Sequence, residues 1–304
     1  MSAPTALPPS PRSSTPRDFE WPTWLLWATI MGGWLATLAW DAPLPLRCLA
    51  LAGLGAWYMS LQHELIHGHP TRWDTVNRLL GLLPIGIWYP YDLYKSLHLI
   101  HHRDHFLTVP GTDPESNYHH PTGNLGRWKL ALFTSQRTVL GRLLIGPALT
   151  IAHVMRACAA DIARGDLHAL WHWLEHALLA ATVLAVAAHW GAIPVWVYLA
   201  ASYAGLGLAM LRSLYEHRPA REPEHRIVIN EAGILWRTLY LNNNYHAVHH
   251  AHPGLAWYRI ASRYRKDRAH YLEGNGGFLL PGYSWLFWNH LIEPIDSPIL
   301  PQSY

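Results

Sequence analysis

The chain has 304 residues, of which 50% are hydrophobic and only 14% are charged. Ordinary soluble domains carry roughly a quarter of charged residues, so this composition argues against a soluble protein. The net charge of +3 requires no nucleic-acid partner, and Cys48 and Cys158 stand far apart without a partner motif, which argues against a disulfide framework.

The chain begins with residues 1–19, which are rich in Pro, Ser and Thr and predict a disordered cytoplasmic tail, not a signal peptide. We expect residues 20–304 to form a single membrane domain. Four apolar blocks, each near the roughly 20 residues that cross a hydrocarbon core, predict transmembrane helices. These lie at about 21–40, 44–62, 170–190 and 193–214. The alternative is four buried helices of a large soluble protein, although soluble helices seldom stay apolar on all sides for this long.

Aromatic and basic residues predict how these helices are oriented. The chain has 17 Trp and 15 Tyr but five Phe, and rings with a polar group favour membrane interfaces. If residues 1–20, 64–169 and 212–304 share one side, every Lys and Arg except Arg47 lies there. The positive-inside rule then predicts that both termini and the large loops are cytoplasmic. We expect the membrane to be a bacterial inner membrane.

Two further apolar stretches, at about 79–94 and 278–300, are interrupted by prolines such as Pro84 and Pro90. They are too short or too broken to cross the membrane, so we expect them at its interface. In that position they would roof a channel that admits a lipid-like chain.

Twenty-two histidines stand out in the sequence, and several are clustered. The clusters are His63 and His67; His98, His101 and His102; and His246, His249 and His250. On a helix, residues three or four apart lie on the same side. Neutral imidazole is the commonest protein metal ligand, and eight imidazoles suffice for two ions. All three clusters fall on the predicted cytoplasmic side, so they can converge without crossing the bilayer.

In these clusters the sequence resembles the membrane fatty acid desaturase and hydroxylase superfamily. Its signature is three histidine boxes of the forms HxxxH, HxxHH and HxxHH, which the three clusters match. The third box also resembles the family in its context, from Asn244 to Arg259. The segment Arg212–Arg218 is similar to the end of the family's fourth membrane helix, which makes His217 a ninth candidate ligand. The resemblance extends over roughly Trp57–Arg259.

The resemblance implies two iron ions, molecular oxygen as co-substrate and hydrogen abstraction from an unactivated carbon. The residues themselves leave zinc and copper open, because both also bind imidazole. Hydropathy, orientation and boxes together predict an all-α integral membrane protein with four transmembrane helices and a cytoplasmic helical cap that carries the histidines. Four polar neighbours are expected to orient the imidazole N–H groups: Glu64, Asp104, Glu216 and Asn244. A surface ion pair is an equal alternative for Asp104.

Several histidines lie near the boxes but outside their spacing. The ones without an assigned role are His69, His105, His119, His120, His168, His172, His176 and His252. The stripe formed by His168, His172 and His176 is interpreted as interfacial or helix-contacting, not as a ligand set.

The predicted function is oxygen-dependent desaturation of a fatty-acyl chain at the membrane. A hydroxylase, a ketolase or a terminal-alkene-forming decarboxylase would use the same di-iron site. A metal transporter and a zinc metalloprotease are the alternatives from other classes, the latter because residues 63–67 read HELIH. The substrate's carrier and the oligomeric state stay open at this point.

No electron-transfer module is visible in the sequence, so a separate ferredoxin, rubredoxin or cytochrome b5 type of protein is expected to supply electrons. The basic stretch Arg259–Arg268 is a candidate docking face for such a donor, or for anionic lipid headgroups.

Overall fold

The computed structural model describes residues 19–103, 106–121 and 126–301. Within these ranges the chain is mostly helical, with fourteen α-helices from α1 (Trp21–Ala39) to α14 (Tyr283–His290). The predicted N-terminal tail lies outside the described residues except for Phe19, which is exposed. The expectation of a helical protein is therefore confirmed.

The central bundle contains α1, α2 (Leu44–Ile66), α8 (Leu167–His189) and α9 (Val195–Arg212). Its core includes Ile30 of α1, Leu61 of α2, Val183 of α8 and Val197 of α9. Helices α2 and α9 pack most closely, because Gly205 lets the backbone of α2 approach: a Cβ at that position would lie 2.8 Å from the carbonyl oxygen of Ala52.

Three of the helices, α2, α8 and α9, are long and apolar enough to cross a membrane. Their bounds lie within a few residues of the predicted spans, except that α2 runs on to Ile66 instead of ending near residue 62. Helix α1 is not among the three: it contains four tryptophans, two glycines and Pro22, which lower its mean hydropathy. The fourth crossing therefore stays a prediction.

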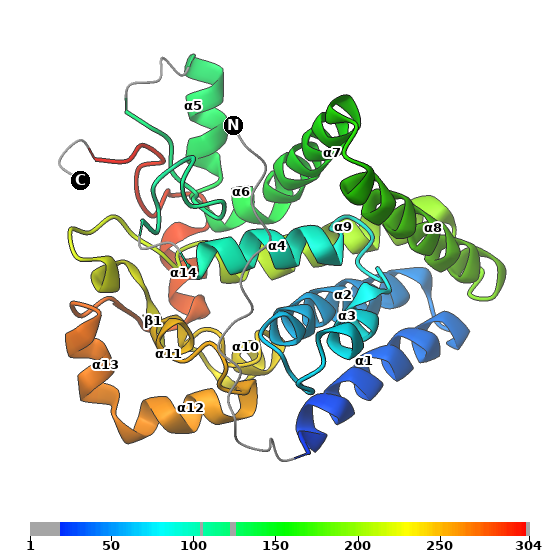
Figure 1. Ribbon diagram of the computed structural model, residues 1–304, viewed down its shortest axis with the longest axis horizontal. Coiled ribbons are helices and arrows are strands. Elements are labelled where there is room, and N and C mark those ends of the chain that lie inside the picture. Colours follow the sequence, from blue (N-terminus) through cyan, green and yellow to red (C-terminus); the bar gives the residue numbers. More distant parts are fainter. Residues whose placement is uncertain (1–18, 104–105, 122–125, 302–304) are drawn as a thin grey trace.

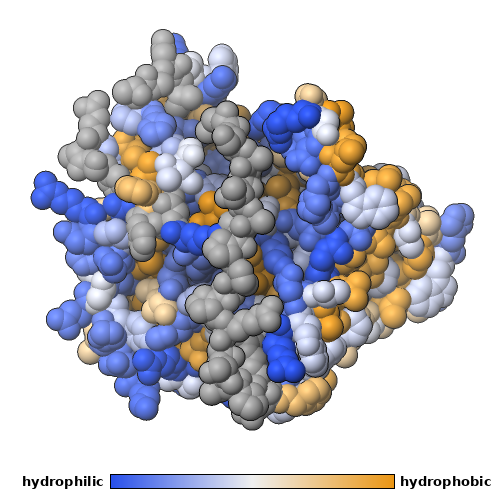
Figure 2. Space-filling model, in the orientation of Figure 1, coloured by the Kyte–Doolittle hydropathy of each residue, from blue (hydrophilic) through white to orange (hydrophobic). Residues whose placement is uncertain are grey.

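The surface differs between the two ends of the molecule. Figure 2 shows hydrophobic residues gathered over the side formed by α8 and α7 (Gly146–Arg164), whereas hydrophilic residues cover the side of α12 (Trp257–Lys266) and α13 (Arg268–Gly274). Figure 1 shows these two pairs of helices at opposite ends of the view. Val183 and Ala187 are the buried residues of α8, and the rest of the helix is exposed or half-buried, as expected for a helix whose apolar side chains face lipid.

Five helices lie between the second and third apolar segments. They are α3 (Asp74–Leu82), α4 (Tyr91–His101), α5 (Arg127–Ser135), α6 (Val139–Leu144) and α7. Pro84 and Pro90 of the first predicted interfacial stretch lie in the connection between α3 and α4, because proline interrupts a helix. Helix α7, with 19 residues, was not anticipated, because Arg156, Asp161 and Arg164 interrupt its apolar pattern.

The part that follows α9 consists of short elements. They are the 3-10 turn η1 (Pro223–Arg226), β1 (Ile229–Asn230), α10 (Ile234–Leu239), α11 (His246–Ala251), α12, α13, β2 (Leu279–Leu280) and α14. Strand β1 pairs in parallel with β2, with Ile229 opposite Leu279. Buried Tyr245, Val248 and Tyr264 pack around this pair, so α11 is held against a small core of its own.

Candidate metal centre

The ends of two helices and the whole of a third bring the histidine clusters together. His63 lies in the last turn of α2, and His67 directly follows that helix. The second cluster ends α4, and the third forms most of α11. His217 lies in the segment after α9, where it forms an antiparallel bridge with Ile227. All nine predicted ligands therefore meet at one place.

The nine imidazoles form two groups, and within each group one ligand atom per residue lies within 4.8 Å of all the others. The five-histidine group contains His63, His67, His98, His102 and His249. The four-histidine group contains His101, His217, His246 and His250.

The split follows from helical geometry. In α4, His98 and His102 are four residues apart and join the five-histidine group, while His101 joins the other group. In α11 the assignment is the opposite. His246 and His250, four residues apart, join the four-histidine group, and His249 joins the five-histidine group. Residues four apart lie nearly above one another, whereas the residue three along points to the other side of that line. An HxxHH sequence on a helix thus serves two adjacent sites, a finer division than the single face expected from spacing.

Ring nitrogens point toward one another inside each group. The Nε2 atoms of His67 and His98 are 2.9 Å apart, and those of His249 and His102 are 3.0 Å apart. In the other group, the Nε2 atom of His246 lies 3.1 Å from that of His217. Burial and neighbouring imidazoles hold the pKa of His249 well below its ordinary value. The neutral ring, which is the form that binds a metal, is therefore favoured.

Two carboxylates that the sequence reasoning missed orient the second cluster. The Nδ1 atom of His98 donates to Glu115 Oε1 at 2.8 Å, and that of His101 donates to Asp113 Oδ1 at 2.8 Å. With the proton on Nδ1, each Nε2 lone pair faces its group. A signal existed, since two acidic residues stand within fifteen residues after the second box, but a loop of that length gives no geometry.

The two carboxylates favour positive charge on the rings of the second cluster. Burial alone would lower the pKa of His101, but Glu115 and Asp113 raise it to about 9. Burial would likewise raise the pKa of Glu115, yet His98 and His101 hold it below its usual range. The Nε2 atom of His101 is buried and has no partner. A buried imidazole nitrogen without a partner among the described residues, on a ring that two carboxylates make favourable for positive charge, fits a bound cation.

The predicted orienting residues have different surroundings. Glu64 lies with Oε1 3.6 Å from His63 Nδ1, and its Oε2 accepts the backbone N–H of Trp257 at 3.0 Å. Glu216 lies with Oε1 3.6 Å from His246 Nδ1 and 3.2 Å from Arg212 Nη1. Asp104 is outside the described residues.

Asn244 does not contact an imidazole among the hydrogen bonds of the described chain; its amide donates to the Asn230 carbonyl at 2.6 Å. The neighbouring Asn243 contacts two instead. Its Oδ1 lies 3.2 Å from His246 Nδ1 and its Nδ2 lies 3.4 Å from His63 Nε2. Asn243 therefore connects the two groups, which the sequence did not indicate.

The remaining histidines make other contacts. His69 pairs with Glu20, His119 stacks on Phe133, His120 contacts the Pro110 carbonyl, His176 the Ile87 carbonyl, and His252 the Tyr271 hydroxyl. His168 packs against His172, which lies 3.0 Å from Asp92. His105 is outside the described residues.

Asp92, His172 and Glu175 form a third group that could hold a metal by distance alone. Arg78, however, lies between the two carboxylates, with its Nη2 atom 2.8 Å from Asp92 Oδ2 and in contact with Glu175. The guanidinium already provides the positive charge there, so this group is an ion-pair network that ties α8 to α3 and α4.

The family model described as fatty acid desaturase matches residues 42–280, which include all nine histidines. The chain belongs to the fatty acid desaturase family. No curated protein matches it. As a member of this family, the chain is expected to be an oxidoreductase that acts on a lipid acyl substrate, and its nine imidazoles are compatible with a metal site.

A cavity of about 380 Å³ is lined by neighbours of the five-histidine group and not by its imidazoles, with wall residues from α2, α4, α7 and α9 among others. It is lined by Glu115, whose carboxylate bonds His98, and by Tyr94, whose ring centroid lies 5.8 Å from that of His98. Met59, Leu97 and Leu206 supply apolar wall. A volume of this size lies within the range of small-molecule sites.

Proposed function

We propose that the chain is a membrane di-iron oxidase that desaturates a fatty-acyl chain. The observation that carries the proposal is the pair of adjacent imidazole groups beside a partly apolar cavity, in a chain of the desaturase family. One ion would bind the five-histidine group and the other the four-histidine group. Bound iron would supply the activation of molecular oxygen and the abstraction of hydrogen from a methylene.

The protein's own residues position this chemistry. Glu115 and Asp113 hold His98 and His101 with their Nε2 atoms turned inward, so the ligands are oriented before a metal arrives. Tyr94 and the apolar cavity wall hold the chain and exclude water beside the five-histidine group. Whether loss of a second hydrogen gives an alkene depends on which substrate carbon would lie within roughly 3–3.5 Å of the atom that reacts with it.

We further propose four membrane crossings with both termini and the histidines cytoplasmic, in a bacterial inner membrane. Helix α1 supports the fourth crossing, because it is uncharged and packs against α2 along its length through Leu26, Ile30 and Leu38. The distribution of Lys and Arg supports the orientation.

Electrons come, in this proposal, from a separate acidic ferredoxin, rubredoxin or cytochrome b5 type of protein. Helix α12 supports this, since Arg265 and Lys266 are exposed on it. Its first residue, Trp257, donates its backbone N–H to Glu64, which lies beside His63. A donor docked on α12 would thus be connected to the five-histidine group through two short contacts.

Product analysis tests this proposal. Purified protein in lipid would receive fatty acids, acyl-CoAs and acyl-lipids with a reducing system, and products would be identified by mass spectrometry. Desaturation predicts an acyl chain two mass units lighter. Recovery of an alcohol, a ketone or a terminal alkene one carbon shorter would overturn desaturation and favour the alternative outcomes of the same site. Peptide hydrolysis or metal transport with no acyl product would contradict the oxidase itself.

A further inference from the structure

The cavity near the five-histidine group has a buried guanidinium in its wall. Arg142 of α6 lines the cavity and is only 5% exposed. Its nitrogens donate to neutral acceptors: Asn117 Oδ1 (2.9 Å), Gln136 Oε1 (3.3 Å), Ser213 Oγ (2.8 Å) and the carbonyls of Met210 (3.1 Å) and Ser213 (3.3 Å). No carboxylate in the described part of the chain forms an ion pair with it.

A buried cation without a counter-charge is unfavourable, and its neighbour shows the usual solution. Arg137 is also buried, and its Nε atom lies 2.5 Å from Asp296 Oδ1. For Arg142, burial and the positive charge of Arg137 lower the pKa to about 10, with Glu216 acting in the opposite sense. The side chain stays charged at neutral pH, so the cavity contains a fixed positive charge that the described protein residues do not neutralise by direct contact.

A donor in the same cavity lacks a hydrogen-bond partner among the described residues. The Nε2 atom of Gln136 is buried and makes no hydrogen bond, although Gln136 Oε1 accepts from Arg142. Buried amide donors are nearly always paired in folded proteins. An unpaired N–H beside an uncompensated guanidinium is the arrangement that an anionic group with two oxygens would complete.

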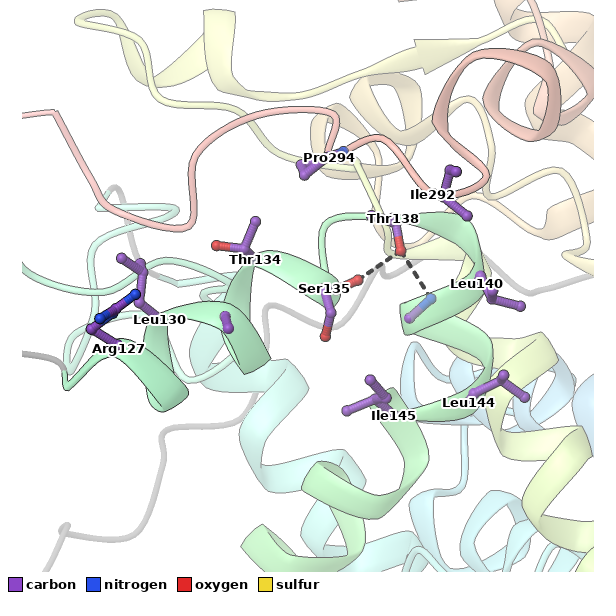
Figure 3. A pocket seen from close by; sticks show the side chains of 12 residues that line it. Arg127, Leu130, Thr134, Ser135, Thr138, Leu140, Leu144, Ile145, Ile292 and Pro294 are labelled. Atoms are coloured by element: carbon purple, nitrogen blue, oxygen red, sulfur yellow. Dashed lines mark hydrogen bonds between the residues drawn. The ribbon is translucent and has the colours of Figure 1, made fainter.

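The backbone fixes the position of Arg142. Thr138 caps the first turn of α6: its hydroxyl accepts the backbone N–H of Gly141 and donates to the Ser135 carbonyl (Figure 3). A Cβ at Gly141 would lie 1.9 Å from that carbonyl oxygen, so only glycine allows the turn. Leu140 and Leu144 line the separate open groove drawn in Figure 3, whereas Arg142 lines the inner cavity.

The other charges that face the cavity are already paired. Glu115 bonds His98, and Arg212 lies 3.2 Å from Glu216. The other titratable lining residues are Tyr89, Tyr94, His119 and His153. The wall also includes Leu149, Leu206 and Met210. The cavity thus combines a buried cation with apolar wall, and its Glu115 and Tyr94 contact His98 of the five-histidine group.

We propose that Arg142 and Gln136 bind the carboxylate of a free fatty acid, so that the free acid, and not a thioester or an ester, is the substrate of this chain. The inference rests on the proposed function, because the acyl chain is then the part that reaches the imidazoles. The anchored carboxylate would also set which carbon of the acyl chain reaches the imidazoles and is oxidised.

Arg47 provides a matched control. It too is buried and donates only to carbonyls, those of Thr37, Leu38 and Gly191. These carbonyls lie near the ends of α1 and α8 that are remote from the histidines, and Arg47 lines neither cavity described above. Arg47→Gln therefore removes a buried guanidinium with similar partners without touching the proposed carboxylate site.

The test compares a fatty acid with its methyl ester at equal chain length. KM and kcat would be measured for wild type, Arg142→Gln, Arg142→Lys, Gln136→Leu and Arg47→Gln, and binding of the acid and the matching alcohol would be titrated directly. Loss of a charge-assisted contact predicts a roughly 10- to 100-fold rise in KM for the acid in Arg142→Gln. The KM for the ester should change less than about threefold in Arg142→Gln. Arg142→Lys should retain part of the preference for the acid over the ester, and Arg47→Gln should retain all of that preference.

Equal losses for acid and ester in Arg142→Gln would overturn the inference, as would a wild type that acts only on thioesters or phospholipids. If Arg142→Gln does not fold, Gln136→Leu and Arg142→Lys give the same comparison. If no acyl substrate is oxidised at all, the proposed function fails on its own. The binding titration then decides the inference: acid binding that exceeds alcohol binding and weakens in Gln136→Leu supports it, and equal binding overturns it.

Discussion

The two histidine groups are built from the same helices but differ in how they are completed. The five-histidine group takes a pair from α2, a pair from α4 and a single histidine from α11. The four-histidine group takes a single histidine from α4, a pair from α11 and His217 from the segment after α9. Each group also has two carboxylates near its imidazoles: Glu64 and Glu115 in the first, Asp113 and Glu216 in the second.

Two short helices, α4 and α11, thus serve two sites at once. Because α4 and α11 contribute to both groups in opposite senses, movement of either helix displaces ligands in both. The five-histidine group is additionally tied to the membrane-type helix α2, whereas the four-histidine group depends on His217 in a non-helical segment. We therefore expect the four-histidine group to lose its metal more easily.

Removal of a ligand gives the largest expected effect. His98→Ala and His101→Ala should each reduce activity by more than the roughly 100-fold seen for residues that only orient ligands. Each should also lower the iron content, His98→Ala through the five-histidine group and His101→Ala through the other. His120→Ala is the control, because this exposed side chain contacts only the Pro110 carbonyl; normal turnover in His101→Ala would break the two-group scheme.

The carboxylates give the next largest effect. Asp113→Asn and Glu115→Gln keep the shape but remove the charge that fixes His101 and His98. A loss of metal affinity of roughly 10- to 100-fold is expected for each, measured by competition with a chelator. Unchanged affinity in both variants would show that the carboxylates do not orient the imidazoles.

Asn243 and Asn244 sharpen the comparison further. Asn243→Ala removes the side chain that contacts both groups, so we expect lower activity and altered metal content. Asn244→Ala removes one of two donors to the Asn230 carbonyl, which keeps the backbone N–H of Ala232, and should cost about 0.5–1.5 kcal/mol of stability with the metal content retained. Denaturation and metal analysis on the two variants separate these effects, and the reverse assignment would favour the original expectation for Asn244.

The smallest effect on activity is expected from labelling sites, which test whether both groups face the same side of the membrane. In a background without Cys48 and Cys158, a cysteine at Ala192, between α8 and α9, should react with an impermeant reagent from outside. One at Gly254, close to α11, should not. Both positions are exposed; external labelling at Gly254 would contradict the cytoplasmic orientation.

Much of this architecture could be predicted because its causes are local. Long apolar runs predicted α2, α8 and α9, and box spacing together with the resemblance predicted all nine clustered imidazoles. The rest depends on contacts between distant segments. Asp113 and Glu115 reach their histidines through a loop, and Asn243 was passed over for Asn244 because only the backbone conformation decides which amide faces the site. Arg142 could not be found either, since its significance lies in the absence of a nearby counter-charge in the fold.

The central claim, two metal ions held by two histidine groups, is tested most directly by metal analysis of the purified wild-type chain and of His217→Ala. His217 contributes only to the four-histidine group. The account predicts two irons per chain in the wild type and about one in His217→Ala, with the five-histidine group still loaded. A single zinc in the wild type, or no change in iron on removal of His217, would contradict it.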